Sequence, residues 1–240
     1  MNGLTRRTFF SGAAASGVAA LGMAVGGSST AEAQLVWKTT DWKLADFEAL
    51  VKHPGRVKQV YDIVPIGGGK FLNNVKNSLN GLEFGFGVPR AELKIAVAMH
   101  GPANMLNYDD AIWSKYQIGE WLNVTDPETG KPAVRNIFVG GGKAEEATPA
   151  SQNPDDEKSM YQAHDMTTLR HRGVQFLSCH TATEEQARAL VKLRNLNESP
   201  EEVVKDMLAH TISGTLVVAS MVAAIALLQA EGHYSYITVG

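Results

Sequence analysis

Three short apolar runs, each followed by a helix-like segment, constrain the fold of this chain most strongly. They occupy residues 92–99, 174–178 and 215–219 and are mostly aliphatic. Short apolar runs without polar alternation are typical of strands buried on both faces of a sheet. Their alternation with helical segments predicts an α/β domain with a mostly parallel sheet and helices on both faces.

The remaining elements follow from periodicity and from turn and capping signals. Thr181-x-x-Glu184 predicts a capping box at the start of one helix, and Ser199-Pro200 predicts the start of the next. Further strands are expected at residues 56–66 and 234–239, and helices at residues 41–52, 70–85, 104–116, 161–173, 183–195, 199–210 and 221–231.

The N-terminus has the pattern of an export signal. Arg6 and Arg7 precede a weakly apolar Ala/Gly stretch at residues 11–27, and a small-x-small site ends at Ala33. The arginine pair resembles the twin-arginine class of signal. We therefore expect a signal peptide at residues 1–33 and a periplasmic protein. The mature chain then has an N-terminal extension at residues 34–56 and an α/β domain at residues 57–240.

Charge and hydropathy exclude two classes of partner. The chain has 22 basic and 25 acidic residues, which gives no basic field for nucleic acid or anionic lipid. Residues 211–230 are uncharged over nearly the length of a bilayer span. Their first part is β-branched and their second part is rich in Ala and Leu, which favours a buried strand leading into a packed helix. No membrane span is expected after signal removal.

A long loop is expected at residues 119–160, where Gly, Pro, Asp and Glu dominate. Loops of this length are often functional or contact a neighbouring protein. Gly-Gly-Gly occurs at residues 67–69 and 140–142, but neither copy has the spacing of a phosphate loop or a dinucleotide fingerprint. No cofactor is therefore predicted.

Cys179, the single cysteine of the chain, is the main candidate for chemistry. It follows the run at residues 174–178, and His100 follows the run at residues 92–99. In parallel sheets, ligands bind beyond the carboxyl ends of the strands, so both residues are expected at the functional edge. A helix N-terminus after Cys179, and a protonated His180, would both favour thiolate over thiol. We therefore predict Cys179, His100 and His180 as site residues.

Other interpretations of Cys179 stay open. Free cysteine is often just a small buried apolar side chain. A metal site with Cys179, His180 and His100 as ligands is a third possibility, although no closely spaced ligand pair supports it and no metal is predicted. A serine hydrolase is poorly supported, because the sequence has no Gly-x-Ser-x-Gly motif.

Three segments together resemble the DsrE/DsrF-like family of sulfur-trafficking proteins, in particular its exported members. They are LKIAVAMHGPA at residues 93–103, LRHRGVQFLSCHTA at residues 169–182 and SGTLVVASMVAAIALLQAEGHYSYI at residues 213–237. The resemblance implies a flavodoxin-like subunit that forms oligomers, here a homo-oligomer. It also implies that Cys179 accepts sulfane sulfur as a persulfide. The implied partners are sulfur donor and acceptor proteins or small sulfur compounds.

Two rival functions accompany this hypothesis of an exported sulfur carrier. One is a non-catalytic binding or assembly module in which Cys179 is packed. The other is a metal- or cofactor-binding periplasmic protein. Whether a carrier also turns over, as a sulfurtransferase, is left open by the sequence.

Overall fold

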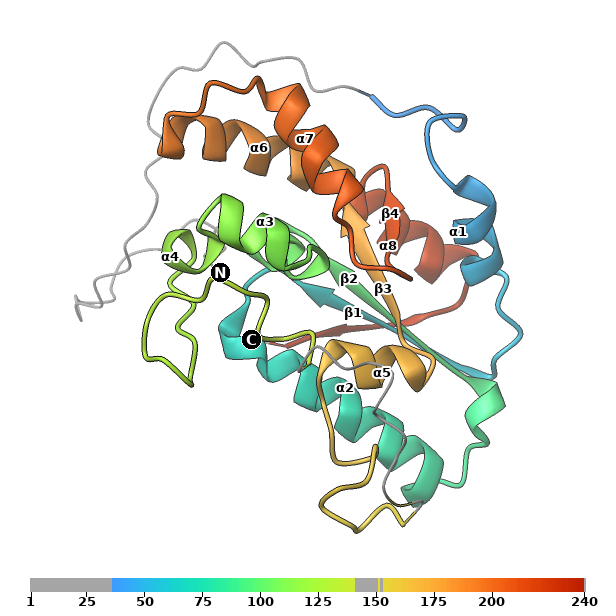
Figure 1. The fold of residues 1–240 in the computed structure, drawn as a ribbon. Coiled ribbons are helices and arrows are strands. Elements are labelled where there is room, and N and C mark those ends of the chain that lie inside the picture. Colours follow the sequence, from blue (N-terminus) through green and yellow to red (C-terminus); the bar gives the residue numbers. More distant parts are fainter. Residues whose placement is uncertain (1–35, 141–150, 152, 240) are drawn as a thin grey trace, which may run out of the picture. The chain divides into compact units, whose positions relative to one another are not determined.

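The computed structural model describes residues 36–140, 151 and 153–239, which form an α/β fold around a parallel sheet (Figure 1). The sheet has the strand order β4-β3-β2-β1-β5, and every neighbouring pair is parallel. The predicted fold class, a flavodoxin-like parallel sheet covered by helices, is confirmed. The strands are β1 (Val57–Ile63), β2 (Leu93–Met99), β3 (Gln175–Cys179), β4 (Leu216–Val218) and β5 (Ser235–Thr238).

Helices cover both faces of the sheet, and the handedness of the connections explains which face each takes. From β1 to β4 the chain steps across the sheet in one direction, so right-handed crossovers put the connecting helices on one face. The return from β4 to β5 runs the other way, so α8 lies on the opposite face with α1. The helices are α1 (Leu44–Val51), α2 (Lys70–Asn80), α3 (Asp110–Lys115), α4 (Ile118–Trp121), α5 (Met166–His171), α6 (His180–Arg194), α7 (Pro200–Ala209) and α8 (Met221–Ala230).

An apolar core lies on each face of the sheet, and alternation along β2 separates the two. Ile95 and Met99 belong to the larger core, with residues of α2, α3, α5, α6 and α7. Ala96 and Ala98 belong to the smaller core, with residues of α1 and α8. Cys179 is also part of the smaller core, so its side chain lies on the α1/α8 face.

The helix expected at residues 104–116 is only half correct. The structure has a 3₁₀ segment at Gly101–Asn107, and α3 begins only at Asp110. Asp109 takes an extended conformation, and its side chain accepts the N–H groups of Ala111 and Ile112. This carboxylate cap starts a new helix, because an N-cap residue is itself non-helical.

The predicted starts of α6 and α7 have different outcomes. Ser199 and Glu202 form the expected capping box at α7. At α6 the predicted box is wrong, because the helix begins at His180 and its N-cap is Cys179. The hydroxyl of Thr181 instead donates to the carbonyl of Ala219.

The described part of the long loop packs against the body of the domain. Val124, Ala133 and Phe138 are buried in the larger core, and an isolated bridge joins Thr125 to Pro132. These residues of the expected loop therefore contribute to the larger core. Residues 141–150 and 152 of this loop, and the expected signal at residues 1–33, lie outside the described residues. Within the described ranges, no helix is both long enough and apolar enough to cross a bilayer.

Candidate functional site

Cys179 ends β3 and caps α6, which places its sulfur between two helix N-termini. Its Sγ accepts the N–H of Ala182, in the first turn of α6, at 3.5 Å. It also accepts the N–H of Met221, the first residue of α8, at 3.4 Å. Amide groups at a helix N-terminus stabilise negative charge, and so does the helix dipole. Sγ therefore accepts hydrogen bonds from the first turns of two helices.

The topology of the sheet explains why two helices converge on this atom. β3 and β4 are neighbours, but the connection from β3 enters α6, which contributes to the larger core, and the connection from β4 enters α8 on the other face. Connections that leave adjacent strands toward opposite faces open a crevice at the carboxyl ends, where α/β proteins bind ligands. Cys179 lies at this switch point.

The thiol is nearly covered by its neighbours. Cys179 is 5% exposed and belongs to the same apolar core as Ala182, Val218 and Met221. Cys179 lies at the expected edge of the sheet, but its side chain is almost fully buried there. A reagent or substrate can reach the sulfur only if a neighbouring segment moves.

A buried polar network holds the backbone of Cys179. Asn104 Oδ1 accepts the Cys179 N–H at 2.9 Å and the Ser178 hydroxyl at 3.0 Å. The Thr183 hydroxyl donates to the Cys179 carbonyl at 2.9 Å, and the Asn104 amide donates to Gln186 Oε1 at 3.0 Å. Sequence reasoning missed Asn104. The signal that could have revealed it is an amide side chain placed just beyond the carboxyl end of a buried strand.

His180 is buried beside Cys179, but its contacts lie elsewhere. Its ring stacks on Trp37 with the ring centroids 3.6 Å apart, and its Nδ1 lies 3.9 Å from Glu184 Oε1. Burial lowers the pKa of His180 to about 4. The imidazole is therefore neutral at neutral pH, so the protonated His180 considered in the sequence analysis does not supply charge to the sulfur.

His100 lies at the same edge of the sheet and pairs with a carboxylate that the sequence analysis did not single out. Its Nε2 is 2.7 Å from Asp62 Oδ1, and the Tyr236 hydroxyl donates to Asp62 Oδ2 at 2.5 Å. Within the described part of the chain, His100 forms no hydrogen bond with Cys179. The signal for Asp62 was an acidic residue near the carboxyl end of an otherwise strand-like run.

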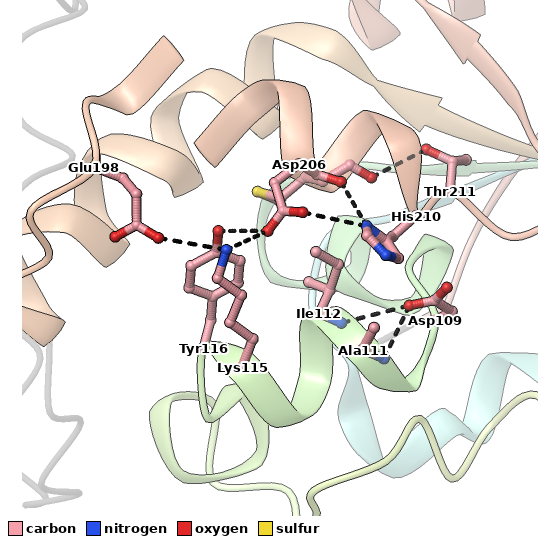
Figure 2. A network of polar contacts seen from close by, with 10 residues as sticks. Asp109, Ala111, Ile112, Lys115, Tyr116, Glu198, Asp206, His210 and Thr211 are labelled. Carbon is pink, nitrogen blue, oxygen red and sulfur yellow. Dashed lines mark hydrogen bonds and ion pairs between the residues drawn. The ribbon is translucent and has the colours of Figure 1, made fainter. Parts of the chain in front are cut away.

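A second group of ionisable side chains, the Asp206 network, joins α3 to α7 (Figure 2). It consists of Lys115, Tyr116, Glu198, Asp206 and His210. Asp206 Oδ2 accepts from Lys115 Nζ at 2.8 Å and from the Tyr116 hydroxyl at 2.7 Å. His210 Nδ1 lies 3.3 Å from Asp206 Oδ1 and 3.0 Å from the Asp206 carbonyl oxygen. None of the predicted site residues belongs to this network.

Hydrogen bonds set the protonation of the Asp206 network. Burial alone would raise the pKa of Asp206, but hydrogen bonds from Lys115 and Tyr116 outweigh it and lower that pKa. Burial, and then the bond to Asp206, raises the pKa of Tyr116 to about 12. The bond to the Asp206 carbonyl raises the pKa of His210. This network connects two helices, and each charged group in it has a partner.

The metal hypothesis finds no arrangement of ligands in the described ranges. No group of three or more His, Cys, Asp or Glu side chains there is placed to hold a metal ion. The three residues named as possible ligands have other contacts: Cys179 with amide groups, His100 with Asp62, and His180 with Trp37.

Comparisons with known proteins assign no family to this chain. No family model and no curated protein matches this chain. A solved structure of a protein of unknown function from Methanobacterium thermoautotrophicum aligns with a TM-score of 0.37 and 14% identity, over 76% of this chain and 99% of the other. The fold and site define an α/β protein with a covered cysteine at the switch point of a parallel sheet.

Proposed function

We propose that this chain handles sulfane sulfur, with Cys179 accepting a sulfur atom as a persulfide and passing it on. The observation that carries the proposal is the convergence of two helix N-termini on Sγ, with donors at 3.5 and 3.4 Å. Such donors stabilise the anionic thiolate that attacks sulfur, and a deprotonated persulfide equally. The sequence resemblance to DsrE/DsrF-like proteins supports the same chemistry. Donors and acceptors are then proteins or small sulfur compounds.

Export and self-association belong to the same proposal. The twin-arginine pattern supports a periplasmic location, where folded protein is delivered. The outer surface of α8 supports a homo-oligomer, because Val222 is 68% exposed and Leu227 41% exposed on a helix without charged residues. Uncharged apolar surface of this kind marks protein contacts. A double substitution, Val222→Glu with Leu227→Glu, is expected to yield monomers by light scattering. Wild-type protein that is already monomeric would contradict the assembly proposal.

Intact mass measurement tests sulfur transfer directly. The wild-type protein is treated with a sulfane sulfur donor, such as thiosulfate or polysulfide, and is measured with and without reductant. The expected result is a gain of one sulfur atom that the reductant removes. Cys179→Ser is the matched control, because a hydroxyl also accepts the N–H groups of Ala182 and Met221. Equal uptake by Cys179→Ser would refute the proposal.

A second function, a binding or assembly module with an inert cysteine, is favoured by one observation. Cys179 is 5% exposed and packed in an apolar core. Labelling of the native protein by an alkylating reagent separates the two functions. A carrier opens locally, so its labelling rate does not fall when global stability rises. A packed thiol reacts only through global unfolding, so its rate falls as the protein is stabilised.

A further inference from the structure

The register of the sheet places Asp62, His100 and Cys179 on one face of three neighbouring strands. Met99 of β2 is in register with Ser178 of β3, and His100 and Cys179 each follow that pair by one residue. The His100 N–H donates to the carbonyl of Ile63, so the pairing of β2 with β1 continues through it.

Side-chain alternation gives the face. Val60, Ala98 and Leu177 all belong to the smaller core, and Asp62, His100 and Cys179 each lie two residues further along the same strands. Side chains two residues apart in a strand point to the same face, and the backbone of His100 is still extended. The spatial order at the carboxyl edge is therefore carboxylate, imidazole, thiol.

The carboxylate holds the imidazole in one orientation. Asp62 accepts from His100 Nε2 at 2.7 Å and from the Tyr236 hydroxyl at 2.5 Å, with side-chain exposures of 17% for Asp62 and 23% for His100. A carboxylate bonded to Nε2 favours the tautomer that carries its proton there. Nδ1 is then the basic atom, and it forms no hydrogen bond within residues 36–140 and 153–239. The ring is partly open to solvent.

We propose that Asp62 is a positioning residue, which holds His100 so that Nδ1 takes the thiol proton of Cys179 and returns it to the departing sulfur of the donor. This inference rests on the proposed sulfur transfer. The Cys179 thiolate attacks the terminal sulfur of an alkyl hydropersulfide, R–S–SH. The new bond joins Sγ to that sulfur, and the old S–S bond breaks with its electron pair on R–S. His100 protonates R–S to give R–SH, so no external oxidant or reductant is consumed.

The arrangement predicts a preference for donors whose leaving group needs a proton. An alkyl thiolate is a basic leaving group and departs faster when it is protonated, whereas an aryl thiolate such as nitrothiobenzoate departs unaided. The substrate class is therefore an alkyl hydropersulfide. An exchange reaction with dithionitrobenzoate uses the same Sγ and the same opening step, but it needs no proton from His100 to release its leaving group.

The test compares both reactions in the full chain and in two variants. Asp62→Asn removes the carboxylate beside His100. Asp206→Asn is the matched control, because it removes a carboxylate that also pairs with a histidine but belongs to the Asp206 network. Rates of sulfur uptake from cysteine hydropersulfide come from intact mass, and rates with dithionitrobenzoate come from absorbance.

Asp62→Asn is expected to slow uptake from the hydropersulfide by about a hundredfold, the scale of general acid–base catalysis, and the aryl exchange by less than about threefold. Asp206→Asn is expected to change neither rate. His100→Gln should match Asp62→Asn, and the double variant should be no slower than either. An equal change in both reactions, or no change in either, would overturn the role of Asp62.

Nitrogen NMR of the His100 ring gives a second readout that does not depend on the variants folding well. The proposal requires the tautomer protonated at Nε2 in the wild-type protein, and a ring protonated at Nδ1 would overturn it. Failure of the two proposals is also distinguishable. If wild-type Cys179 takes no sulfur from any donor, the proposed function fails. If it takes sulfur and Asp62→Asn is equally fast, the positioning role alone fails.

Discussion

The carboxyl edge of the sheet and the Asp206 network contain similar side chains in opposite surroundings. Each has a histidine near an acidic residue, yet His180 has its pKa lowered by burial, whereas His210 has its pKa raised by a hydrogen bond to a carbonyl. At the edge, Asp62 is bonded to His100 and to the Tyr236 hydroxyl, and the N–H groups of Ala182 and Met221 donate to Sγ. In the network, the charge of Asp206 is matched by Lys115, and its carboxylate also accepts the neutral Tyr116 hydroxyl.

The difference teaches how to separate a candidate site from a structural tie in this fold. An ion pair that is exposed to solvent contributes little to stability, and each of its groups already has a partner. Burial without full pairing costs stability and keeps a group reactive, which is typical of functional sites. The five predictions below ask whether the two regions respond differently to the same kind of change.

The largest effect is expected from Asn104→Leu, which keeps volume but removes the acceptor beneath the cysteine. It leaves the N–H of Cys179 and the hydroxyl of Ser178 without their buried partner. The free energy of unfolding, measured by urea denaturation, should fall by about 4 kcal/mol. If the loss were no greater than for Asp206→Asn, the buried network would not be holding the edge of the sheet.

The next effect is the pH dependence contributed by His180. Its folded pKa of about 4 lies below the ordinary value of 6.5, so as pH falls the unfolded chain takes up the proton first. The contribution of His180 to the free energy of unfolding is fully present above the unfolded pKa. As pH falls toward the folded pKa, about 3 kcal/mol of that free energy is lost. His180→Gln should flatten urea-unfolding free energies across this window. An unchanged slope in His180→Gln would assign the loss to other groups.

An effect of intermediate size is expected from Trp37→Ala. The substitution removes the ring that stacks on His180 at 3.6 Å and opens the imidazole to water. The pKa of His180, followed by NMR titration, should rise toward its ordinary value, and the free energy of unfolding should fall by about 1 kcal/mol. Trp42→Ala is the control, because Trp42 contacts Phe47 rather than His180. A His180 pKa equally raised by Trp42→Ala would show that the whole segment, not the stack, excludes water.

The smallest effect is expected in the Asp206 network. Asp206→Asn removes the negative charge from the acceptor of Tyr116, whose pKa should fall from about 12 toward its ordinary value in an ultraviolet titration. The free energy of unfolding should fall by less than about 1 kcal/mol, because the pairs are largely in solvent.

The pH dependence of the network runs opposite to that of His180. The folded pKa of His210 lies above its unfolded value, so its contribution is fully present below the unfolded pKa and is lost as pH rises through the folded one. Substitution of His210 by Gln should remove this small loss. If stability instead fell with falling pH through His210, the proposed contrast between the two regions would be wrong.

The fold was predictable from the sequence because buried parallel strands leave a local signature. The apolar runs that became β2, β3 and β4 are found within one or two residues of their expected positions. The capping pair Ser199 and Glu202 is equally local. Local signals failed where a side chain is used over a long distance. Asn104 and Asp109 interrupt the helix expected at residues 104–116, because one bonds to β3 and the other caps α3.

The candidate site was predictable only in part, for the same reason. Cys179 and His100 follow apolar runs, and the rule that ligands bind at carboxyl ends was sufficient to find them. Asp62 and Tyr236 could not be assigned, because their link to His100 depends on which strands are neighbours. The burial of the thiol depends on α8, which comes from a distant part of the chain. Neither of these two relations can be inferred from the spacing of residues in the sequence.

The register of β1, β2 and β3 fixes the relative positions of the candidate site residues. A deletion or insertion of one residue within β2 would move the imidazole of His100 to the opposite side of the sheet, away from Asp62. The connection between β2 and β3 is under no such restriction, and it contains the long loop near residues 119–160. Related chains should therefore tolerate changes in the length of that connection more readily than changes in the number of residues within these strands.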